Sequence, residues 1–268
     1  MAAAYPQVVL FGDSLFEGCV DVQDGFSFYA ALQKHCLRRY DVVNRGFSGY
    51  NTSQALHIFE QLFPEPGPGT PDMKYLVILL GANDAALPLD DDNQHVPLEQ
   101  YKANLARLAS HPRVAAHGCK VLLVTPPPLD EIRRTEVDVA QHGRATREQA
   151  RSAAYSAAAR EVAAELGVVC VDLAKALMDH AVANTPGWDA SQPPLGSAAG
   201  GRRGHLEKLL PDGLHMSGEA YRVLWGLVEP EIEPRFPNAD TVGYAWPVWR
   251  DAPWSEPGMS VLEKSSSK

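Results

Sequence analysis

The chain has 268 residues, which is enough for one α/β domain that buries a large core without disulfides or metals. Hydrophobic residues make up 45% of the chain and charged residues 21%, as in an ordinary globular protein. The formal net charge is -9 and no run of basic residues occurs, which argues against nucleic acid or an anionic membrane surface as a partner bound through bulk charge.

Short apolar runs alternate with amphipathic segments along the chain, in the pattern of a parallel sheet covered by helices. In chain order, strands are predicted at Gln7–Phe11, Tyr40–Val43, Tyr75–Leu80, Cys119–Val124 and Val168–Val171. Helices between and after them are predicted at Phe26–Arg38, Thr52–Phe63, Leu98–Ser110, Thr146–Leu166, Asp172–Ala183 and Ser217–Glu229. This order predicts an α/β fold with a doubly wound sheet of five parallel strands.

Local signals refine two of these elements. Tyr75–Leu80 is a continuous apolar run, which suits a parallel strand that is covered on both faces. The helix that begins at Thr146 opens with Thr-Arg-Glu-Gln, a capping-box pattern, and Gly167 ends it. No repeat or domain boundary is visible, so we expect a single domain over residues 1–268, with its core at about 7–230 and a tail at 234–268.

Two long segments lack periodicity and are predicted to be irregular, Pro126–Ala145 and Thr185–Arg203. Irregular segments of this length in a compact domain are functional or disordered, so either is a candidate lid over a site. The tail contains Trp246, Trp249 and Trp254, which we expect to pack against the domain. The alternative for these tryptophans is a subunit interface, which would make the protein a homodimer.

The cysteines and the N-terminus bear on the compartment. The four cysteines are far apart and form no Cys-x-x-Cys pair, which predicts free thiols in a reducing compartment. Cys119 and Cys170 lie in apolar runs and are expected to be buried. The N-terminus has no basic stretch followed by an apolar one, and no apolar run reaches the ~20 residues of a membrane span. We therefore expect a cytoplasmic protein without a membrane contact.

Polar clusters adjoin the predicted strands and the last helix. In open α/β sheets ligands bind outside the carboxyl ends of the strands, so these clusters are the candidate site. In chain order the clusters are Gly12-Asp13-Ser14-Leu15, Asn44-Arg45-Gly46, Gly81-Ala82-Asn83-Asp84 and Asp212-Gly213-Leu214-His215.

The residue types in these clusters match the requirements of acyl transfer. A serine hydroxyl becomes a nucleophile when a neighbouring base takes its proton, and His215 can be that base for Ser14. Asp212 lies three residues before His215, where it can accept the Nδ1 proton and fix the tautomer. An oxyanion needs preorganised donors, for which the candidates are the backbone N–H groups of Ser14 and Gly46 and the side-chain amide of Asn83. Glycine suits close approach of the backbone to substrate.

Taken one at a time, these features are typical of turns and helix caps. Arg45 and Asp84 are predicted to make local hydrogen bonds, Ser217 to cap a helix, and Asp90-Asp91-Asp92 to be a solvated loop. Their joint occurrence at consecutive strand ends is what favours a catalytic site. The sequence has no Gly-x-Ser-x-Gly elbow, P-loop, Gly-x-Gly-x-x-Gly or zinc pattern, so we expect neither a cofactor nor a metal.

The four clusters resemble the four sequence blocks of the SGNH/GDSL hydrolase superfamily, from Gln7 to about Trp225. A closer resemblance, to the isoamyl acetate-hydrolysing esterase subfamily, is carried by four longer segments. These are Asn44–Thr52 (NRGFSGYNT), Gly81–Ala85 (GANDA), Thr125–Glu131 (TPPPLDE) and Asp212–His215 (DGLH). The resemblance implies a three-layer α/β/α flavodoxin-like sandwich and cofactor-free hydrolysis of short-chain acyl esters. The departure from the family pattern is Thr185–Arg203, which resembles an insertion.

By the same resemblance Ser14 is the nucleophile, His215 the base and Asp212 its orienting partner, with Ser14, Gly46 and Asn83 as oxyanion donors. The hypothesis is therefore a serine esterase that hydrolyses acetate-type esters of small alcohols through an acyl-enzyme. Alternatives within hydrolases are a carbohydrate O-acetylesterase, a lysophospholipase and a thioesterase, which use the same residues. Acyl transfer to an alcohol and an inactive homologue serving as a binding module are the remaining alternatives.

Overall fold

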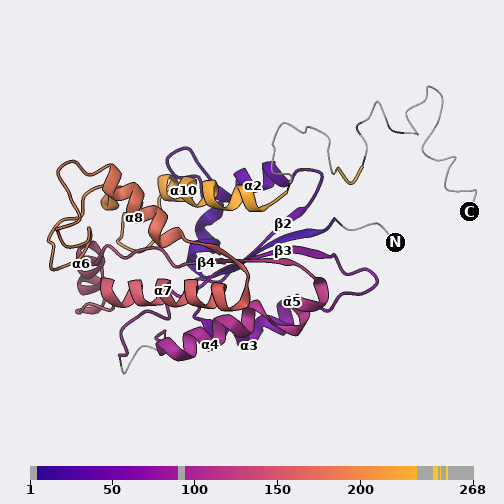
Figure 1. The fold of residues 1–268 in the computed structure, drawn as a ribbon, viewed down its shortest axis with the longest axis horizontal. Helices are drawn as coiled ribbons and strands as arrows, with labels where there is room; N and C mark the ends of the chain where they lie inside the picture. The colour runs from indigo at the N-terminus through magenta and orange to yellow at the C-terminus, as the bar shows by residue number, and fades with distance from the viewer. Residues whose placement is uncertain (1–4, 90–93, 234–243, 247, 249–251, 253–268) are drawn as a thin grey trace, which may run out of the picture.

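The computed structural model describes residues 5–89, 94–233, 244–246, 248 and 252. Five strands form one parallel sheet in the order β2-β1-β3-β4-β5 (Figure 1). Their bounds are β1 Gln7–Gly12, β2 Asp41–Gly46, β3 Met73–Leu79, β4 Lys120–Val124 and β5 Val169–Val171. The predicted five-stranded, doubly wound parallel sheet is confirmed.

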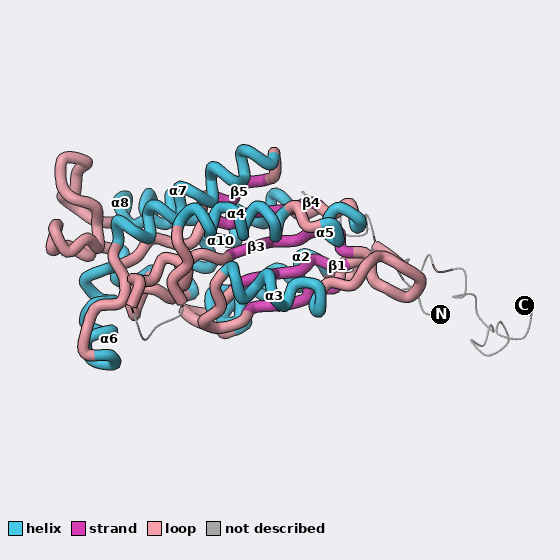
Figure 2. The backbone as a smooth tube through the Cα atoms, turned by 90° about the horizontal axis from the view of Figure 1, so that it is seen from below, coloured by secondary structure: helices cyan, strands magenta, loops and turns pink. Residues whose placement is uncertain are grey.

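Helices cover both faces of the sheet, which makes three layers. One layer contains α2 (Phe28–Cys36), α8 (Leu173–Ala183) and α10 (Gly218–Val228). The other layer, toward the viewer in Figure 2, contains α3 (Thr52–Leu62), α4 (Leu98–Ala109), α5 (Pro112–His117) and α7 (Gln149–Leu166). The shorter helices are α1 (Ser14–Glu17), α6 (Glu131–His142) and α9 (Leu206–Leu209), with 3-10 turns at Gly18–Val20 and Glu229–Glu231.

Alternation along the strands divides the core between the two layers. In β1, Val8 and Leu10 belong to the core under α2, α8 and α10, whereas Val9 and Phe11 belong to the core under α3, α4 and α7. Successive strand residues point to opposite faces, so a strand buried on both faces must be apolar throughout. This explains why the apolar runs of the sequence are continuous.

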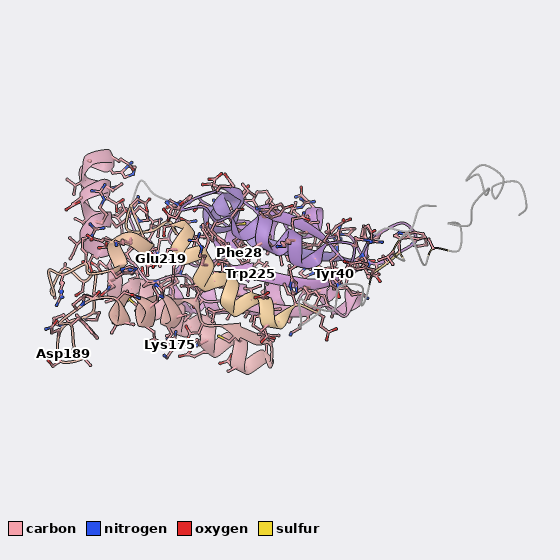
Figure 3. The ribbon with its side chains drawn as sticks, turned by 90° about the horizontal axis from the view of Figure 1, so that it is seen from above. Phe28, Tyr40, Lys175, Asp189, Glu219 and Trp225 are labelled. Atoms are coloured by element: carbon pink, nitrogen blue, oxygen red, sulfur yellow. The ribbon has the colours of Figure 1, made fainter. Side chains whose placement is uncertain are left out.

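Aromatic pairs join the helices to the sheet and to one another. Phe11 of β1 contacts Phe59 edge to face, with ring centroids 5.6 Å apart. On the opposite face Phe28 of α2 meets Trp225 of α10, with centroids 6.1 Å apart, and the two are labelled in Figure 3. Such pairs contribute about 0.5–1.5 kcal/mol beyond their buried area. They hold α10, and with it the segment that precedes it, against α2.

The parallel register places the ends of three strands beside one another. Gly12 of β1 pairs with Gly46 of β2 and with Leu79 of β3. Gly46 is packed against α1, because a Cβ at this position would lie 2.1 Å from the backbone nitrogen of Glu17. Only glycine lets β2 approach the start of α1 this closely.

Two predicted segments differ from the structure. Pro126–Ala145 was predicted to be irregular, but it contains α6, whose N-cap Asp130 accepts a hydrogen bond from the backbone N–H of Arg133. The helix predicted from Thr146 begins at Gln149, and the capping box is absent, since Glu148 at the N-cap makes no side-chain bond. Thr146 instead binds Asp138 of α6 through both its backbone N–H and its hydroxyl, which ties the two segments together.

The prediction of two buried cysteines is also wrong. Cys170 is exposed and Cys119 is half-buried, because β5 is the edge strand and Cys119 lies before the first residue of β4. Cys19 and Cys36 are the buried pair, and all four thiols are free.

Thr185–Arg203 forms turns without a helix or strand, as predicted. In the tail, the backbone N–H of Ala245 donates to the carbonyl of Arg38, whose guanidinium lies over the ring of Tyr244. Trp246 is exposed. Two further predictions concern Asp90-Asp91-Asp92 and the packing of Trp249 and Trp254, which lie outside the described residues.

The close approach at Gly46 predicts a stability effect. Gly46→Ala places a methyl group against the backbone of α1, and overpacking of this kind costs about 1–3 kcal/mol or more. We expect the melting temperature to fall by several degrees in calorimetry, at about 2–4 °C per kcal/mol for a domain of this size. Gly67→Ala is the control, because its Cβ meets no atom within 4 Å. Equal melting temperatures for the two variants would contradict the packing argument.

Candidate active site

Ser14 lies at the first position of α1, directly after β1. Asp13 caps this helix, since its Oδ1 accepts a hydrogen bond of 2.9 Å from the backbone N–H of Leu15. Asp13 is fully buried, whereas Ser14 is half-buried. The strand-to-helix turn therefore buries the carboxyl and presents the next side chain at the carboxyl edge of the sheet.

Three side chains form a continuous hydrogen-bonded chain. Ser14 Oγ lies 3.0 Å from His215 Nε2, although 201 residues separate them in sequence. His215 Nδ1 lies 2.7 Å from Asp212 Oδ2, and a carboxylate only accepts, so Nδ1 carries the proton. Nε2 is then free to accept the Ser14 proton. This geometry activates a serine hydroxyl as a nucleophile.

The Asp212 carboxylate is held in its ionised form. Burial raises its pKa, but the hydrogen bonds from the His215 ring, the His215 N–H and the Leu214 N–H lower the pKa well below its ordinary value. The intervening Gly213 has φ +88, and a Cβ there would lie 2.5 Å from the backbone nitrogen of Arg134. Glycine at this turn lets the Asp212–His215 segment fold tightly beside α6.

Asn83 follows β3, and its amide is fixed at both ends. Its Oδ1 accepts a hydrogen bond of 3.1 Å from Arg147 Nη2, and its Nδ2 donates to the Tyr50 carbonyl at 2.9 Å. Because a guanidinium only donates, the amide orientation is unambiguous. One N–H of Nδ2 remains for another acceptor, and Asn83 lines the same cavity as Ser14 and His215.

The structure places Gly46 elsewhere than predicted. Its backbone N–H donates to Asn44 Oδ1 at 2.8 Å, and its α-carbon faces α1. Among the described residues, the glycine that lines the cavity with Ser14 and Asn83 is Gly49. Gly49 has φ +81 in the turn that leads from β2 to α3, a conformation that favours glycine. The assignment of Gly46 as an oxyanion donor is therefore corrected.

A cavity of about 580 Å³ opens beside Ser14 and His215. Most of its lining side chains are polar or charged: Ser14, Ser48, Asn83, Gln94, Arg134, His142, Arg144, Thr146, Arg147 and His215, with Gly49, Leu89 and Leu214. Part of this wall comes from Pro126–Ala145, one of the two predicted lid segments. In the described part of the chain, Thr185–Arg203 contributes nothing to it.

Two arginines support the site that the sequence did not single out. Buried Arg147 bonds Asn83 Oδ1 and Gln94 Oε1, and thereby holds one wall of the cavity. Arg134 pairs with Asp138 at 2.6 Å and reaches Asp212 Oδ2 at 3.4 Å. The signals were misread: Arg147 lay in the capping-box pattern and Arg134 in a segment predicted to be irregular. Asp84, predicted to bond locally, binds the N–H and hydroxyl of Thr52.

Two buried carboxyls lie beneath the site. Burial raises the pKa of Asp13 to about 7; the Leu15 N–H lowers it, and the neighbouring Asp84 carboxylate raises it further. Burial also raises the pKa of Asp84 to about 6, against the hydrogen bonds from Thr52. Asp13 Oδ2 has no hydrogen-bond partner in the described structure. The ionised form of Asp13 is therefore costly in the fold.

Comparison with known proteins agrees with this geometry. Residues 10–223 match the GDSL-like Lipase/Acylhydrolase family. The isoamyl acetate-hydrolyzing esterase 1 homolog of Bos taurus is 31% identical over 263 residues, which cover 96% of this chain and 92% of that protein. A GDSL esterase/lipase of Arabidopsis thaliana is 31% identical over 270 residues, with 98% and 96% covered.

Solved structures of hydrolases share the fold. The lipase/acylhydrolase from Enterococcus faecalis superposes with a TM-score of 0.56 at 26% identity, covering 85% of this chain and 95% of that one. The acetyl xylan esterase AlAXEase gives a TM-score of 0.60 at 18% identity, covering 84% and 99%.

The chain belongs to the GDSL-like lipase/acylhydrolase family, and the resemblance seen in the sequence is confirmed. It is a carboxylic ester hydrolase, whose substrates are therefore esters. Within the described residues, no helix combines the length and apolarity that a membrane crossing needs.

Arg147 is expected to act through Asn83. Arg147→Met removes the donor that orients the Asn83 amide, so kcat for an ester substrate should fall about tenfold or more, with a smaller change in KM. Steady-state kinetics on purified enzyme measures both. Arg160→Met is the matched control on the same helix, because Arg160 pairs with Asp172 away from the cavity. Equal kcat in both variants would remove Arg147 from a positioning role.

Asp13 is expected to make stability fall as the pH rises. Its pKa is 3.8 ordinarily and about 7 in the fold, so between these values the native state holds a proton that the unfolded chain has released. Stability conferred by that proton is complete below pH 3.8 and is lost as the pH rises through 7.

In urea unfolding at pH 5 and pH 7, Asp13→Asn should therefore lose less free energy of unfolding than the wild type over this interval. Asp84 titrates in both proteins, so their difference isolates Asp13. A larger loss in the variant would mean that the Asp13 carboxyl is already ionised at pH 5.

Proposed function

We propose that this protein is a serine esterase that hydrolyses short-chain carboxylic esters through an acyl-enzyme on Ser14. The observation that carries the proposal is the chain from Ser14 Oγ through His215 to Asp212, which opens onto a polar cavity. A hydroxyl, an imidazole and a carboxylate in this order supply the nucleophile, the base and the group that fixes the base.

In the first half-reaction Ser14 Oγ attacks the ester carbonyl while its proton passes to His215 Nε2. Asp212 stabilises the imidazolium, and its depressed pKa keeps it ionised as that charge develops. The protonated imidazole then donates its proton to the departing alkoxide, which leaves as the alcohol.

The developing oxyanion needs donors that are already oriented. The free N–H of Asn83 Nδ2, held in place by Arg147 and Tyr50, is one such donor. The backbone N–H of Ser14, at the first turn of α1, is a second. We assign the third to the backbone of Gly49, which lines the cavity beside Asn83. Donors fixed in advance need no reorganisation during the reaction, which is the source of their effect.

In the second half-reaction water attacks the acyl-enzyme, with His215 again as base. Ser14 Oγ leaves and recovers its proton from Nε2, which releases a carboxylic acid. The groups of this chain suffice for both steps.

The cavity wall supports small acyl and alcohol groups. Each methylene of a long chain gains about 0.8 kcal/mol only when it is buried against apolar surface. The apolar lining side chains are Leu89 and Leu214, so a long acyl chain has little to gain here. The isoamyl acetate-hydrolyzing esterase 1 homolog at 31% identity supports the same class of substrate.

The same wall supports a second candidate, hydrolysis of acetyl esters of carbohydrates. Its arginine, glutamine and threonine side chains, represented by Arg144, Gln94 and Thr146, match the hydrogen-bonding groups of a sugar better than those of an alkyl alcohol. An acetylated oligosaccharide, tested beside isoamyl acetate, distinguishes the two.

Acyl length is tested with p-nitrophenyl esters from C2 to C16. We expect kcat/KM to be highest between C2 and C6 and to fall for longer chains, because the polar lining offers them no apolar contact. A maximum at the long chains would overturn the short-chain assignment and favour a lipase or thioesterase.

The nucleophile is tested in parallel with Ser14→Ala. This variant should lose turnover and labelling by a fluorophosphonate, which requires an activated serine, and keep the melting temperature of the wild type. Ser110→Ala, at an exposed serine beyond α4, is the control and should keep both. Near wild-type turnover by Ser14→Ala would contradict the mechanism.

A further inference from the structure

Three side chains that take no part in the ester chemistry converge from three helices. They are His180 in the last turn of α8, His205 at the N-cap of α9 and Glu219 in the first turn of α10. The Nε2 atoms of both histidines lie 2.8 Å from the same oxygen, Glu219 Oε1, and the two rings are 5.5 Å apart. Figure 3 labels Glu219 at the start of α10.

The backbone around the cluster is firmly held. The His205 N–H donates to Thr185 Oγ1 at 2.9 Å, and the Thr185 hydroxyl donates to the Ala181 carbonyl at 2.7 Å. Ser217 caps α10 and so fixes the turn that bears Glu219. Behind the cluster the helices share a core of fully buried residues, which comprises Leu177, Ala181, Leu206, Leu209 and Ala220. The three side chains therefore meet on a preorganised frame.

The charges in the cluster favour a cation. Burial tends to raise the pKa of Glu219, but the hydrogen bonds from His180 and His205 hold it below its ordinary value, so the carboxylate is ionised. Both imidazoles must then direct an N–H toward one oxygen. When the proton of each ring moves to Nδ1, two nitrogen lone pairs and one carboxylate oxygen face the same point.

We propose that His180, His205 and Glu219 bind a divalent cation of the zinc type, with His180 Nε2, His205 Nε2 and a Glu219 carboxylate oxygen as ligands. Two imidazoles and a carboxylate are a donor set that zinc accepts in proteins. The three ligand atoms already lie within 4.8 Å of one another. Bonds of about 2.0–2.2 Å to a tetrahedral ion place ligands roughly 3.3–3.5 Å apart, so the present contacts need to open by only about half an ångström.

The site has room for an ion to enter and for water to complete its coordination. The side chains of His180 and Glu219 are each 34% exposed, and that of His205 is 14% exposed. The ion would join α8, α9 and α10 just beyond the segment that carries Asp212 and His215. Its role is structural, because an ion that binds only the folded chain stabilises it.

The test is calorimetric titration of zinc into full-length protein stripped with a chelator. We expect one ion per chain and a melting temperature that rises with zinc. His205→Ala and Glu219→Gln should each weaken binding by about tenfold or more, because each removes a ligand or its charge. His57→Ala is the control, since His57 is exposed on α3, and it should leave the affinity unchanged.

Two further measurements keep the result unambiguous. The titration is repeated in His215→Asn, because the Asp212–His215 pair also offers an imidazole and a carboxylate to an ion; full-affinity binding there supports the proposed site. Circular dichroism of His205→Ala and Glu219→Gln checks that they fold, and the visible spectrum of bound Co²⁺ should change in both.

Three results would overturn the proposal. They are no binding tighter than on the order of 0.1 mM, an affinity that His205→Ala and Glu219→Gln leave unchanged in folded protein, and binding that His215→Asn abolishes.

Discussion

Parallel pairing of β1 with β2 and β3 is the constraint on which the site depends. It brings the carboxyl ends of three strands to one edge of the sheet, where Ser14 and Asn83 leave their strands. His215 arrives from the far end of the chain because α10 packs on the same layer as α2, through Phe28 and Trp225. The 3.0 Å contact between Ser14 and His215 is therefore a product of core packing, and its precision is inherited from the sheet.

The site is assembled on buried polar groups whose presence costs stability. Asp13 has a carboxyl oxygen without a partner and a raised pKa, whereas Arg147 and Asp84 are bonded to the loops around them. Buried polar groups with satisfied hydrogen bonds fix one arrangement of loops, and an incompletely satisfied group stores strain. Strain beneath a rigid catalytic turn is consistent with a fold that gives up stability to hold Ser14 in place.

The walls around that turn come from segments of different character. The side that holds Arg134 and Arg147 is polar and belongs to α6 and the turn after it, and this makes the cavity a site for small polar esters. On the other side of the Asp212–His215 segment, His180, His205 and Glu219 bind α8, α9 and α10 to one another. The catalytic histidine thus lies between two polar networks, each of which restrains the loop that carries it.

The sequence by itself determined the sheet and most of the residues at its edge. Continuous apolar runs and helical periodicity are local, and the rule that ligands bind at carboxyl ends singles out Ser14, Asn83, Asp212 and His215. The tertiary structure alone decided that Gly46 packs against α1 while Gly49 lines the cavity, that Pro126–Ala145 contains α6, and that Arg147 orients Asn83. These depend on where segments distant in the chain meet, because hydrogen bonds and close contacts between them leave no periodic signal in the sequence.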